Sequence, residues 1–348
     1  MEKIQPPETH QETLEALKYK LEGIVPEAEI ILKAEMAYEI NRIKKEKDAV
    51  ILGHNYMEPA LYHSIPDYVG DSLGLSKISA ETTASRIVFC GVEFMAETAK
   101  ILSPDKMVLL PASKAGCSLA ESITGEDVRK LKEQYPGVPV ITYVNTYAEV
   151  KAETDICCTS SNAAKIVNQL DSDTVICLPD EFLAKNIAKE TGKNVVFPGH
   201  SNGNGELQNS MIVWDGKCEV HDKFSLQDVE NVRKQFPDAL ILAHPECPPE
   251  VVEASDYSGS TTAMVNYVQQ SDADRYMLFT ECSMGDNIAA ENKEKEMVKM
   301  CSVRCPHMNQ ITLEDTLECL KKDQYQIHID ETIRKKAKAS LDRMLEMS

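Results

Sequence analysis

Short apolar runs alternate with stretches of helical pattern along the chain, and this alternation occurs in three successive segments. Three apolar runs each end on a polar signature: VILGHNYMEP from Val50, VITYVNTYAE from Val140 and LILAHPECPP from Leu240. Each is followed by a helical stretch, a second apolar run (RIVFCGV, TVICLPD or RYMLFTE) and a second helical stretch. Such alternation is typical of βαβ units with parallel sheets. The pattern therefore predicts an α/β fold built from three copies of one small layered domain.

An aspartate followed by a turn of small polar residues recurs at the same place in each segment. It is Asp67 in DYVGDS, Asp155 in DICCTS and Asp256 in DYSGST. Loose self-similarity is common in α/β proteins, but the ordered recurrence of strand, aspartate, turn and cysteine favours true internal repeats. We expect a helical arm at 1–47, repeats at 48–125, 126–226 and 227–320, and a C-terminal helix at 321–348.

One cysteine closes each repeat: Cys117, Cys218 and Cys305. They lie far apart in the chain, which excludes a local zinc finger or ferredoxin motif, whose ligands are only a few residues apart. If the domains pack around a pseudo-threefold axis, the thiolates converge and favour a soft metal or an iron–sulfur cluster. A cubane with three protein ligands would keep one iron open as a Lewis acid. Three structural thiols are the alternative.

Polar side chains follow the first strand of each repeat. Ligands of parallel α/β sheets bind beyond the carboxyl ends of the strands, so these side chains would meet there. A single histidine after a strand is more often a capping or core residue, whereas a converging set from three domains favours acid–base chemistry. The set comprises His54, Asn55, Tyr56, Tyr143, Asn145, Tyr147, His244 and Glu246.

Serine and threonine residues stand at the starts of the helical stretches. Backbone N–H groups and the helix dipole make such positions receptors for anions. A simple N-cap needs no ligand, but three such turns in one pseudo-symmetric site would favour binding of phosphate or carboxylates. The residues are Ser72, Ser160, Ser260 and Thr261.

The charge balance makes nucleic acid an unfavourable partner. Lys and Arg number 37 and Asp and Glu 56, a net charge of −19, which repels phosphate backbones over most of the surface. A small anionic substrate can still bind where the site itself is electropositive. The start, MEKIQPPETHQETLEALKYK, does not resemble a secretory signal, and no stretch is apolar enough to cross a bilayer. We therefore expect a cytoplasmic protein without a membrane partner, whose eleven cysteines are thiols or metal ligands.

Taken together, these motifs resemble the quinolinate synthase family. GHNY, GDSL, GVEFMAETAKIL, AGCSLAE, YVNTYAEVKA, TSSNA, WDGKCEVH, HPEC, SGSTTAM and CPHM follow the family's order from about His54 to Met308. The resemblance implies three αβα three-layer domains around a pseudo-threefold axis and one [4Fe–4S] cluster. It also implies the condensation of iminoaspartate with dihydroxyacetone phosphate to quinolinate, phosphate and water in NAD biosynthesis. An aspartate oxidase or dehydrogenase, which makes the unstable iminoaspartate, would be the metabolic partner.

The resemblance also implies roles for individual residues. The cluster ligands would be Cys117, Cys218 and Cys305. The acids and bases would be His54, Tyr56, His244 and Glu246. The substrate contacts would be Tyr143 and Asn145, with Ser72, Ser160, His221, Ser260 and Thr261 as anchors for carboxylates and phosphate. The open iron would act as a Lewis acid and not as a redox relay.

The sequence departs from the family at one point. Some members have a CxxC motif that ends at the third ligand, whereas Cys301 and Cys305 are spaced CxxxC. Thiol–disulfide regulation through this motif is therefore in doubt, and we expect Cys301 to be a bystander. The alternatives are a [4Fe–4S] dehydratase of another hydroxy acid, an iron–sulfur sensor or electron carrier, and a structural zinc protein. Electron carriers normally give the cluster four protein ligands and do not need acid–base groups at the strand ends.

Overall fold

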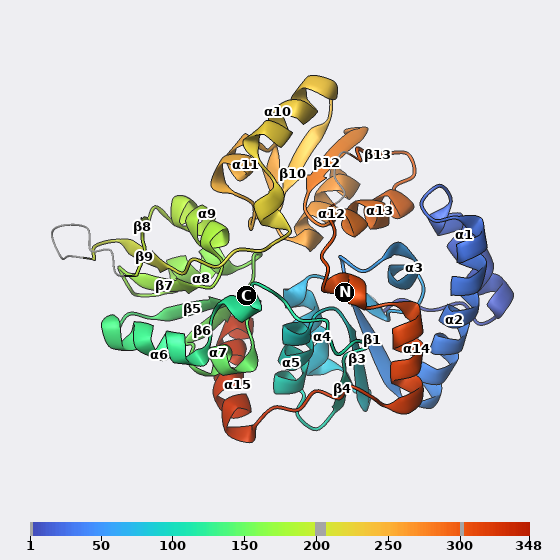
Figure 1. Ribbon diagram of the computed structural model, residues 1–348, viewed down its shortest axis with the longest axis horizontal. Helices are drawn as coiled ribbons and strands as arrows, with labels where there is room; N and C mark the ends of the chain where they lie inside the picture. The colour runs from blue at the N-terminus through green and yellow to red at the C-terminus, as the bar shows by residue number, and fades with distance from the viewer. Residues whose placement is uncertain (1–2, 199–206, 300–302) are drawn as a thin grey trace.

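The computed structural model describes residues 3–198, 207–299 and 303–348. Three parallel β-sheets, each flanked by helices, lie around a common centre (Figure 1). The predicted α/β class with three short parallel sheets and terminal helices is thereby confirmed. The apolar runs form the strands because helices cover the sheets, and every residue of the runs VITY and VICL is buried.

The first and third units share one topology, with strand orders β2-β1-β3-β4 and β11-β10-β12-β13. The first contains β1 (Ala49–His54), α3 (Pro59–Tyr62), β2 (Tyr68–Gly70), α4 (Ser72–Glu81), β3 (Arg86–Cys90), α5 (Glu93–Leu102) and β4 (Met107–Leu109). The third contains β10 (Leu240–Ala243), α11 (Pro249–Ala254), β11 (Tyr257–Ser258), α12 (Thr261–Gln270), β12 (Arg275–Phe279), α13 (Cys282–Glu291) and β13 (Glu296–Met297).

The second unit has the same core with one additional strand, in the order β6-β5-β7-β9-β8. The inserted strand β9 is formed by the buried run SMIV and separates β7 from β8. This fifth strand was not expected from the repeat. The elements are β5 (Val140–Tyr143), α7 (Ala148–Ala152), β6 (Ile156–Cys158), α8 (Ala163–Gln169), β7 (Val175–Leu178), α9 (Glu181–Thr191), β8 (Asn194–Val196) and β9 (Ser210–Val213).

The recurring aspartate has the same structural role in each unit. Its carboxylate accepts a hydrogen bond from a backbone N–H of the first strand, and its own N–H donates to the carbonyl of that strand residue. A basic side chain from the preceding helix lies within ion-pair distance of the carboxylate. The three sets are Ile51–Asp67–Lys44, Val140–Asp155–Lys132 and Ile241–Asp256–Arg233.

A short 3₁₀ helix and a capped α-helix follow each of the three repeat-closing cysteines. The 3₁₀ helices are η1 (Ala120–Ser122), η2 (His221–Lys223) and η3 (Met308–Gln310), and each begins three residues after its cysteine. The α-helices are α6 (Gly125–Gln134), α10 (Leu226–Gln235) and α14 (Leu313–Lys322). Their N-caps, Thr124, Ser225 and Thr312, each accept a hydrogen bond from the backbone N–H of an aspartate. The repeat therefore extends beyond the cysteine in both sequence and structure.

Helices from both ends of the chain pack on the repeats. Helices α1 (His10–Leu21) and α2 (Glu27–Glu46) flank the first unit, where α14 packs beside α2 (Figure 1). Helix α15 (Glu331–Glu346) packs on α7 and β6 of the second unit. Lys20 of α1 pairs with Glu291 of α13, so the N-terminal helices bridge the first and third units.

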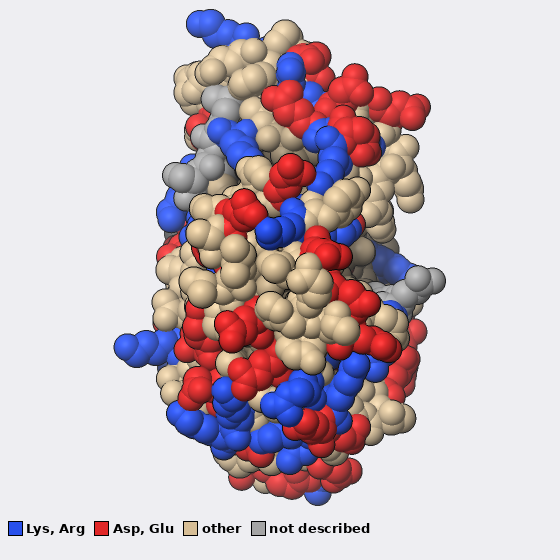
Figure 2. Space-filling view, turned by 90° about the vertical axis from the view of Figure 1, so that its right-hand side faces the viewer, with Lys and Arg blue, Asp and Glu red and all other residues tan. Residues whose placement is uncertain are grey.

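Acidic and basic side chains are interspersed on the side of the molecule at the right of Figure 1, as Figure 2 shows. Ion pairs such as Lys18–Glu27 and Arg42–Glu46, along α1 and α2, are examples of this mixture. Exposed pairs of this kind contribute little to stability. Within the described part of the chain, no helix is both long and apolar enough to cross a membrane.

Candidate active site

One cavity is lined by side chains from all three units. It brings together every residue to which the family resemblance gave a role, except Ser260. These residues follow strands or begin helices of different units, so the fold gathers groups that are far apart in the sequence. They are His54, Tyr56, Ser72, Cys117, Tyr143, Asn145, Ser160, Cys218, His221, His244, Glu246, Thr261 and Cys305.

The three cysteines of the cavity have the same local setting. Each thiol is partly exposed and accepts a hydrogen bond from the backbone N–H three residues later, at Ala120, His221 or Met308. Burial raises the pKa of Cys117 to about 12 and that of Cys305 to about 11, and raises the pKa of Cys218 well above its ordinary value. The N–H donors counteract part of this rise because they favour the thiolate.

The three thiols line one cavity and interact electrostatically with one another. A charge on Cys305 raises the pKa of Cys117, and a charge on Cys117 raises the pKa of Cys218. Three neighbouring thiolates repel one another unless a cationic centre lies between them. N–H groups directed at cysteine sulfurs are also a recurrent feature of iron–sulfur sites. The donor set therefore fits an iron–sulfur cluster held by one cysteine from each unit.

The remaining described cysteines do not line this cavity, and no disulfide joins two of the described cysteines. Cys282 is partly exposed and lines a separate pocket beside α13. Cys301 lies outside the described residues. The others are buried in the units: Cys90, Cys157, Cys158, Cys177, Cys247 and Cys319.

Two histidines of the cavity are held in the same way by their own loops. The backbone N–H of Tyr56 donates to Nδ1 of His54 over 3.2 Å, and that of Glu246 donates to Nδ1 of His244 over 3.3 Å. Burial lowers the pKa of His54 to about 4 and that of His244 to about 3, so both rings are neutral at pH 7. Because Nδ1 is the acceptor, the ring proton is on Nε2. Each histidine can therefore donate a hydrogen bond from Nε2.

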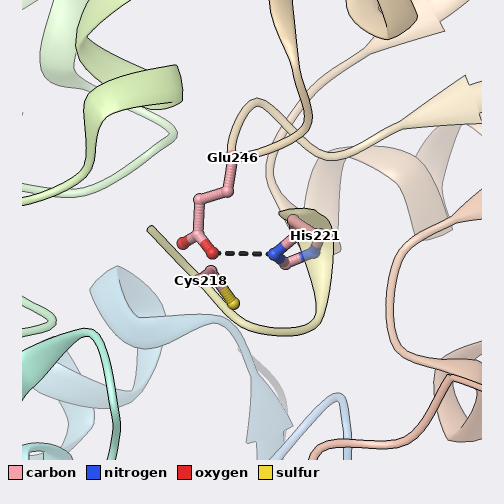
Figure 3. A group of neighbouring side chains, drawn as sticks. All are labelled: Cys218, His221 and Glu246. Atoms are coloured by element: carbon pink, nitrogen blue, oxygen red, sulfur yellow. Dashed lines mark hydrogen bonds and ion pairs between the residues drawn. The ribbon is translucent and has the colours of Figure 1, made fainter. Parts of the chain in front are cut away.

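Glu246 and His221 form a buried pair at the centre of the site (Figure 3). Nδ1 of His221 lies 2.8 Å from Oε2 of Glu246, and the His221 ring stacks on His244 with centroids 4.7 Å apart. Burial alone would raise the pKa of Glu246, but the adjacent imidazoles of His221 and His244, with hydrogen bonds from His221 and Tyr143, lower it below the ordinary value. Glu246 is therefore a carboxylate.

The side chains of Cys218, His221 and Glu246 also place three possible metal-ligand atoms within 4.8 Å of one another. Cys218 and His221 come from the turn that contains η2, and Glu246 comes from the loop after β10 (Figure 3). Nδ1 of His221 and one carboxylate oxygen of Glu246 are, however, already in contact with each other.

Thr280, directly after β12, connects this pair to Tyr56 and was not predicted from the sequence. Its hydroxyl is hydrogen bonded to the Tyr56 hydroxyl and lies 3.0 Å from Nε2 of His221. Burial raises the pKa of both Tyr56 and Tyr143 well above the ordinary value, so both phenols are protonated at pH 7. The run RYMLFTE, which has a polar residue directly after a buried strand, was the signal that could have indicated Thr280.

The serine and threonine residues divide into two groups. Ser72, Ser160 and Thr261 line the cavity, whereas Ser260 caps α12 and donates to Oδ2 of Asp71 over 3.1 Å. Asp71 caps α4, lines the cavity and was also not predicted, although it belongs to the GDSL motif. Asn55 lies behind the cavity wall, where its amide donates to Thr261 over 2.9 Å. Tyr147 is likewise absent from the lining.

Apolar side chains complete the wall near the first cysteine. Val92, Phe94 and Met95 come from the start of α5, within the motif GVEFMAETAKIL, and Val220 and Met308 stand near the other two cysteines. An apolar wall lowers the local dielectric and so strengthens the polar interactions inside the site. The site thus combines thiols, an acid–base network and an apolar wall.

Comparison with known proteins agrees with this geometry. The family model described as Quinolinate synthetase A protein matches residues 38–346. The quinolinate synthase of Sinorhizobium fredii (strain NBRC 101917 / NGR234) is 47% identical over 328 residues, which are 94% of this chain and 87% of that protein. The quinolinate synthases of Caulobacter vibrioides (strain NA1000 / CB15N) and Xylella fastidiosa (strain 9a5c) are also 47% identical, over 91% and 88% of this chain and 83% and 85% of theirs. The chain belongs to the quinolinate synthetase A family.

Proposed function

We propose that this protein catalyses the quinolinate synthase reaction: it condenses iminoaspartate with dihydroxyacetone phosphate and releases quinolinate, phosphate and water. The observation that carries the proposal is that three equivalent thiols line the same cavity as His54, Tyr56 and Glu246. Family membership supports the activity, since the relatives that match over most of the chain are quinolinate synthases.

Proteins of this family bind an iron–sulfur cluster, and we propose that here it is a [4Fe–4S] cluster held by Cys117, Cys218 and Cys305. When bound, the cluster supplies an open iron as a Lewis acid for a substrate oxygen. The reaction itself loses only phosphate and water, so its atoms balance without an electron acceptor. The cluster therefore needs to activate only the leaving groups and does not need to transfer electrons.

The substrates are anions, and the anchors are assigned on that ground. Iminoaspartate carries two carboxylates and dihydroxyacetone phosphate carries a phosphate, whereas the chain as a whole is acidic. Ser72 and Thr261 begin α4 and α12, where backbone N–H groups favour anions. Ser160, Tyr143 and Asn145 complete the proposed contacts. Ser260 is better explained as the cap that holds Asp71, so its role is indirect.

The residues around Glu246 suit the proton transfers that the condensation requires. Each loss of water or phosphate needs a base that removes a proton from carbon and a donor at the departing oxygen. Glu246 is ionised and can accept a proton, while His54 and His244 present Nε2–H and Tyr56 presents a phenol O–H. We assign His54 to the ketose–aldose shift of the triose, because a neutral imidazole can move a proton between adjacent oxygens.

The reaction implies a supplier for one substrate. Iminoaspartate hydrolyses readily in water, so it must be made close to the time of use by oxidation of aspartate. We propose that an aspartate oxidase or dehydrogenase acts before this protein. The pairing is metabolic, and the proposal does not require a stable complex.

Anaerobic iron and sulfide analysis tests the proposal most directly. The wild-type protein should contain about four irons per chain, and C117A, C218A and C305A should each lose the cluster and quinolinate formation. C282A is the matched control, since Cys282 is also partly exposed but lies outside the cavity. A colourless zinc-loaded protein, or an active cluster in any of the three variants, would overturn the assignment. Turnover of a hydroxy acid without dihydroxyacetone phosphate would support a dehydratase instead.

A further inference from the structure

An asparagine side chain from one unit holds the catalytic loop of the next unit, and this occurs twice. Nδ2 of Asn186, on α9, donates to the carbonyl oxygens of Pro245 at 2.8 Å and Cys247 at 3.1 Å. These carbonyls lie on either side of Glu246. The side chain of one residue thus holds the peptide group that precedes the proposed base and the peptide group that follows Cys247.

Asn287, on α13, makes the same contacts with the loop of the first unit. Its Nδ2 donates to the carbonyl oxygens of Asn55 at 3.2 Å and Met57 at 2.9 Å, which lie on either side of Tyr56. Asn186 and Asn287 occupy equivalent positions, in EFLAKNIAKE and CSMGDNIAAE. The loops HPEC and HNYM are equivalent as well, because each follows the first strand of its unit.

The loop of the second unit is held from the same direction, but not by an asparagine, because the first unit has a threonine at the equivalent position. The position equivalent to Asn186 in α5 is Thr98, whose hydroxyl donates to the Phe94 carbonyl of its own helix. The neighbouring Glu97 instead accepts a hydrogen bond from the backbone N–H of Ala148, just after the YVNT loop, over 2.8 Å. The first unit therefore contacts the loop of the second, the second that of the third, and the third that of the first.

These contacts fix the direction of the side chain between them. The carbonyls of Asn55 and Met57 accept hydrogen bonds from Asn287, while the N–H of Tyr56 donates to His54. The peptide before Tyr56 is thus held at both its carbonyl and its N–H. The peptide after Tyr56 is held by the N–H of Met57, which donates to the carbonyl of His54 over 3.0 Å, so the Cα–Cβ bond of Tyr56 keeps its direction into the cavity. Asn287 is only 3% exposed, so loss of its N–H groups would leave buried carbonyls unpaired.

We propose that Asn186 and Asn287 are positioning residues that aim Glu246 and Tyr56 at the substrate from the neighbouring unit. The roles of Glu246 and Tyr56 rest on the proposed function, but the two clamps are defined by contacts alone. A catalytic group displaced by about 1 Å can lose on the order of 100-fold in rate. The two asparagines thus make the activity depend on how adjacent units are docked.

The first test uses the holoenzyme variants N186D and N287D, which keep the shape of the side chain but lose the N–H donors. Each should lower kcat by about 10- to 100-fold with the iron and sulfide content of the wild type. N292D is the matched control, because Asn292 caps the same helix α13 and donates only within it, to Ile288 at 2.8 Å. If the introduced carboxylate prevents folding, N186S and N287S take the place of N186D and N287D in this test. Wild-type kcat in the folded variants, or losses that follow iron content, would overturn the proposal.

Hydrogen exchange provides a second test that needs no substrate. N287D should accelerate exchange of the amides in residues 54–58 and leave residues 244–248 at the wild-type rate, and N186D should do the reverse. A general loss of rigidity would accelerate both segments in either variant, and an irrelevant contact would accelerate neither; both results contradict the proposal. Because no turnover is measured, this outcome is independent of whether the proposed reaction is correct.

Discussion

Nδ1 of His221 lies 2.8 Å from Oε2 of Glu246, and both side chains are almost completely buried. The carboxylate keeps its charge there because His221 and Tyr143 stabilise it against the cost of burial. Such a group can act as a base at neutral pH. We predict that E246Q, which keeps the size but removes the charge, lowers kcat by about 100-fold or more without changing the iron content.

A second glutamate–histidine contact, in which the glutamate side chain is exposed and the histidine side chain is buried, provides the control for this variant. Oε1 of Glu291 lies 3.2 Å from Nδ1 of His63, between α13 and the end of α3 and outside the central cavity. E291Q likewise removes a carboxylate charge that is paired with a histidine, but at a site outside the cavity. We expect kcat within about 2-fold of the wild type for E291Q, and equal losses in the two variants would show that the effect of E246Q is structural.

We predict that the activity depends on the hydroxyl of Thr280, which lies between Tyr56 and His221 and is hydrogen bonded to both. T280V removes the hydroxyl at nearly constant volume and leaves both partners without this contact. We expect kcat to fall by about 10-fold in T280V and to recover in T280S, which restores the hydroxyl, as measured by steady-state quinolinate formation. Equal activity of T280V and T280S would show that only the packing of Thr280 is needed.

The sequence pattern predicted the three units and the convergence of their cysteines because both follow from features that repeat. Strand, aspartate and cysteine recur in one order, so a shared fold places them at equivalent points. Strand β9 was not expected because a single apolar run, SMIV, has no counterpart in the other units. Thr280 and Asp71 were not singled out because a threonine after a strand and an aspartate at a helix start usually have only structural roles.

The clamps made by Asn186 and Asn287 illustrate a different limit of sequence reasoning. Both residues lie within amphipathic helices, where an asparagine gives no sign of the carbonyls it will meet. Their partners belong to another unit, more than fifty residues away in the chain. Only the docking of the units reveals such contacts, whereas cysteines and histidines are recognisable by their chemistry alone.

The recurring aspartates should differ in their effect on stability even though their backbone contacts are the same. Asp67 pairs with Lys44 at 3.3 Å, and both side chains are at most 5% exposed. Asp155 pairs with Lys132 at 3.0 Å, with both side chains 36% exposed. Removing one partner of a buried pair costs about 3–5 kcal/mol, whereas an exposed pair contributes about 1 kcal/mol or less.

We therefore predict that D67N lowers the free energy of unfolding by several times more than D155N. Asparagine keeps an oxygen that can accept the backbone N–H of Ile51 or Val140, so the comparison isolates the charge. Urea denaturation under anaerobic conditions measures both variants. Equal destabilisation would mean that the backbone contact, and not the ion pair, determines the effect.

Glu97 should make stability depend on pH in the direction opposite to most carboxylates. Burial raises its pKa to about 7, although Lys151 and the N–H of Ala148 partly oppose this rise. The folded protein therefore binds a proton between pH 4.5 and pH 7 that the unfolded chain releases. This extra proton stabilises the folded protein. Its contribution to the free energy of unfolding is fully present below pH 4.5 and is lost as pH rises through 7.

E97Q imitates the protonated side chain and should remove this dependence. Between pH 4.5 and pH 8, the free energy of unfolding of the wild type should fall by up to about 3 kcal/mol relative to that of E97Q, as the raised pKa implies. The difference in urea midpoints between the two proteins, measured at several pH values, gives the result directly. A constant difference across this range would show that Glu97 is ionised in the folded state throughout, held so by Lys151.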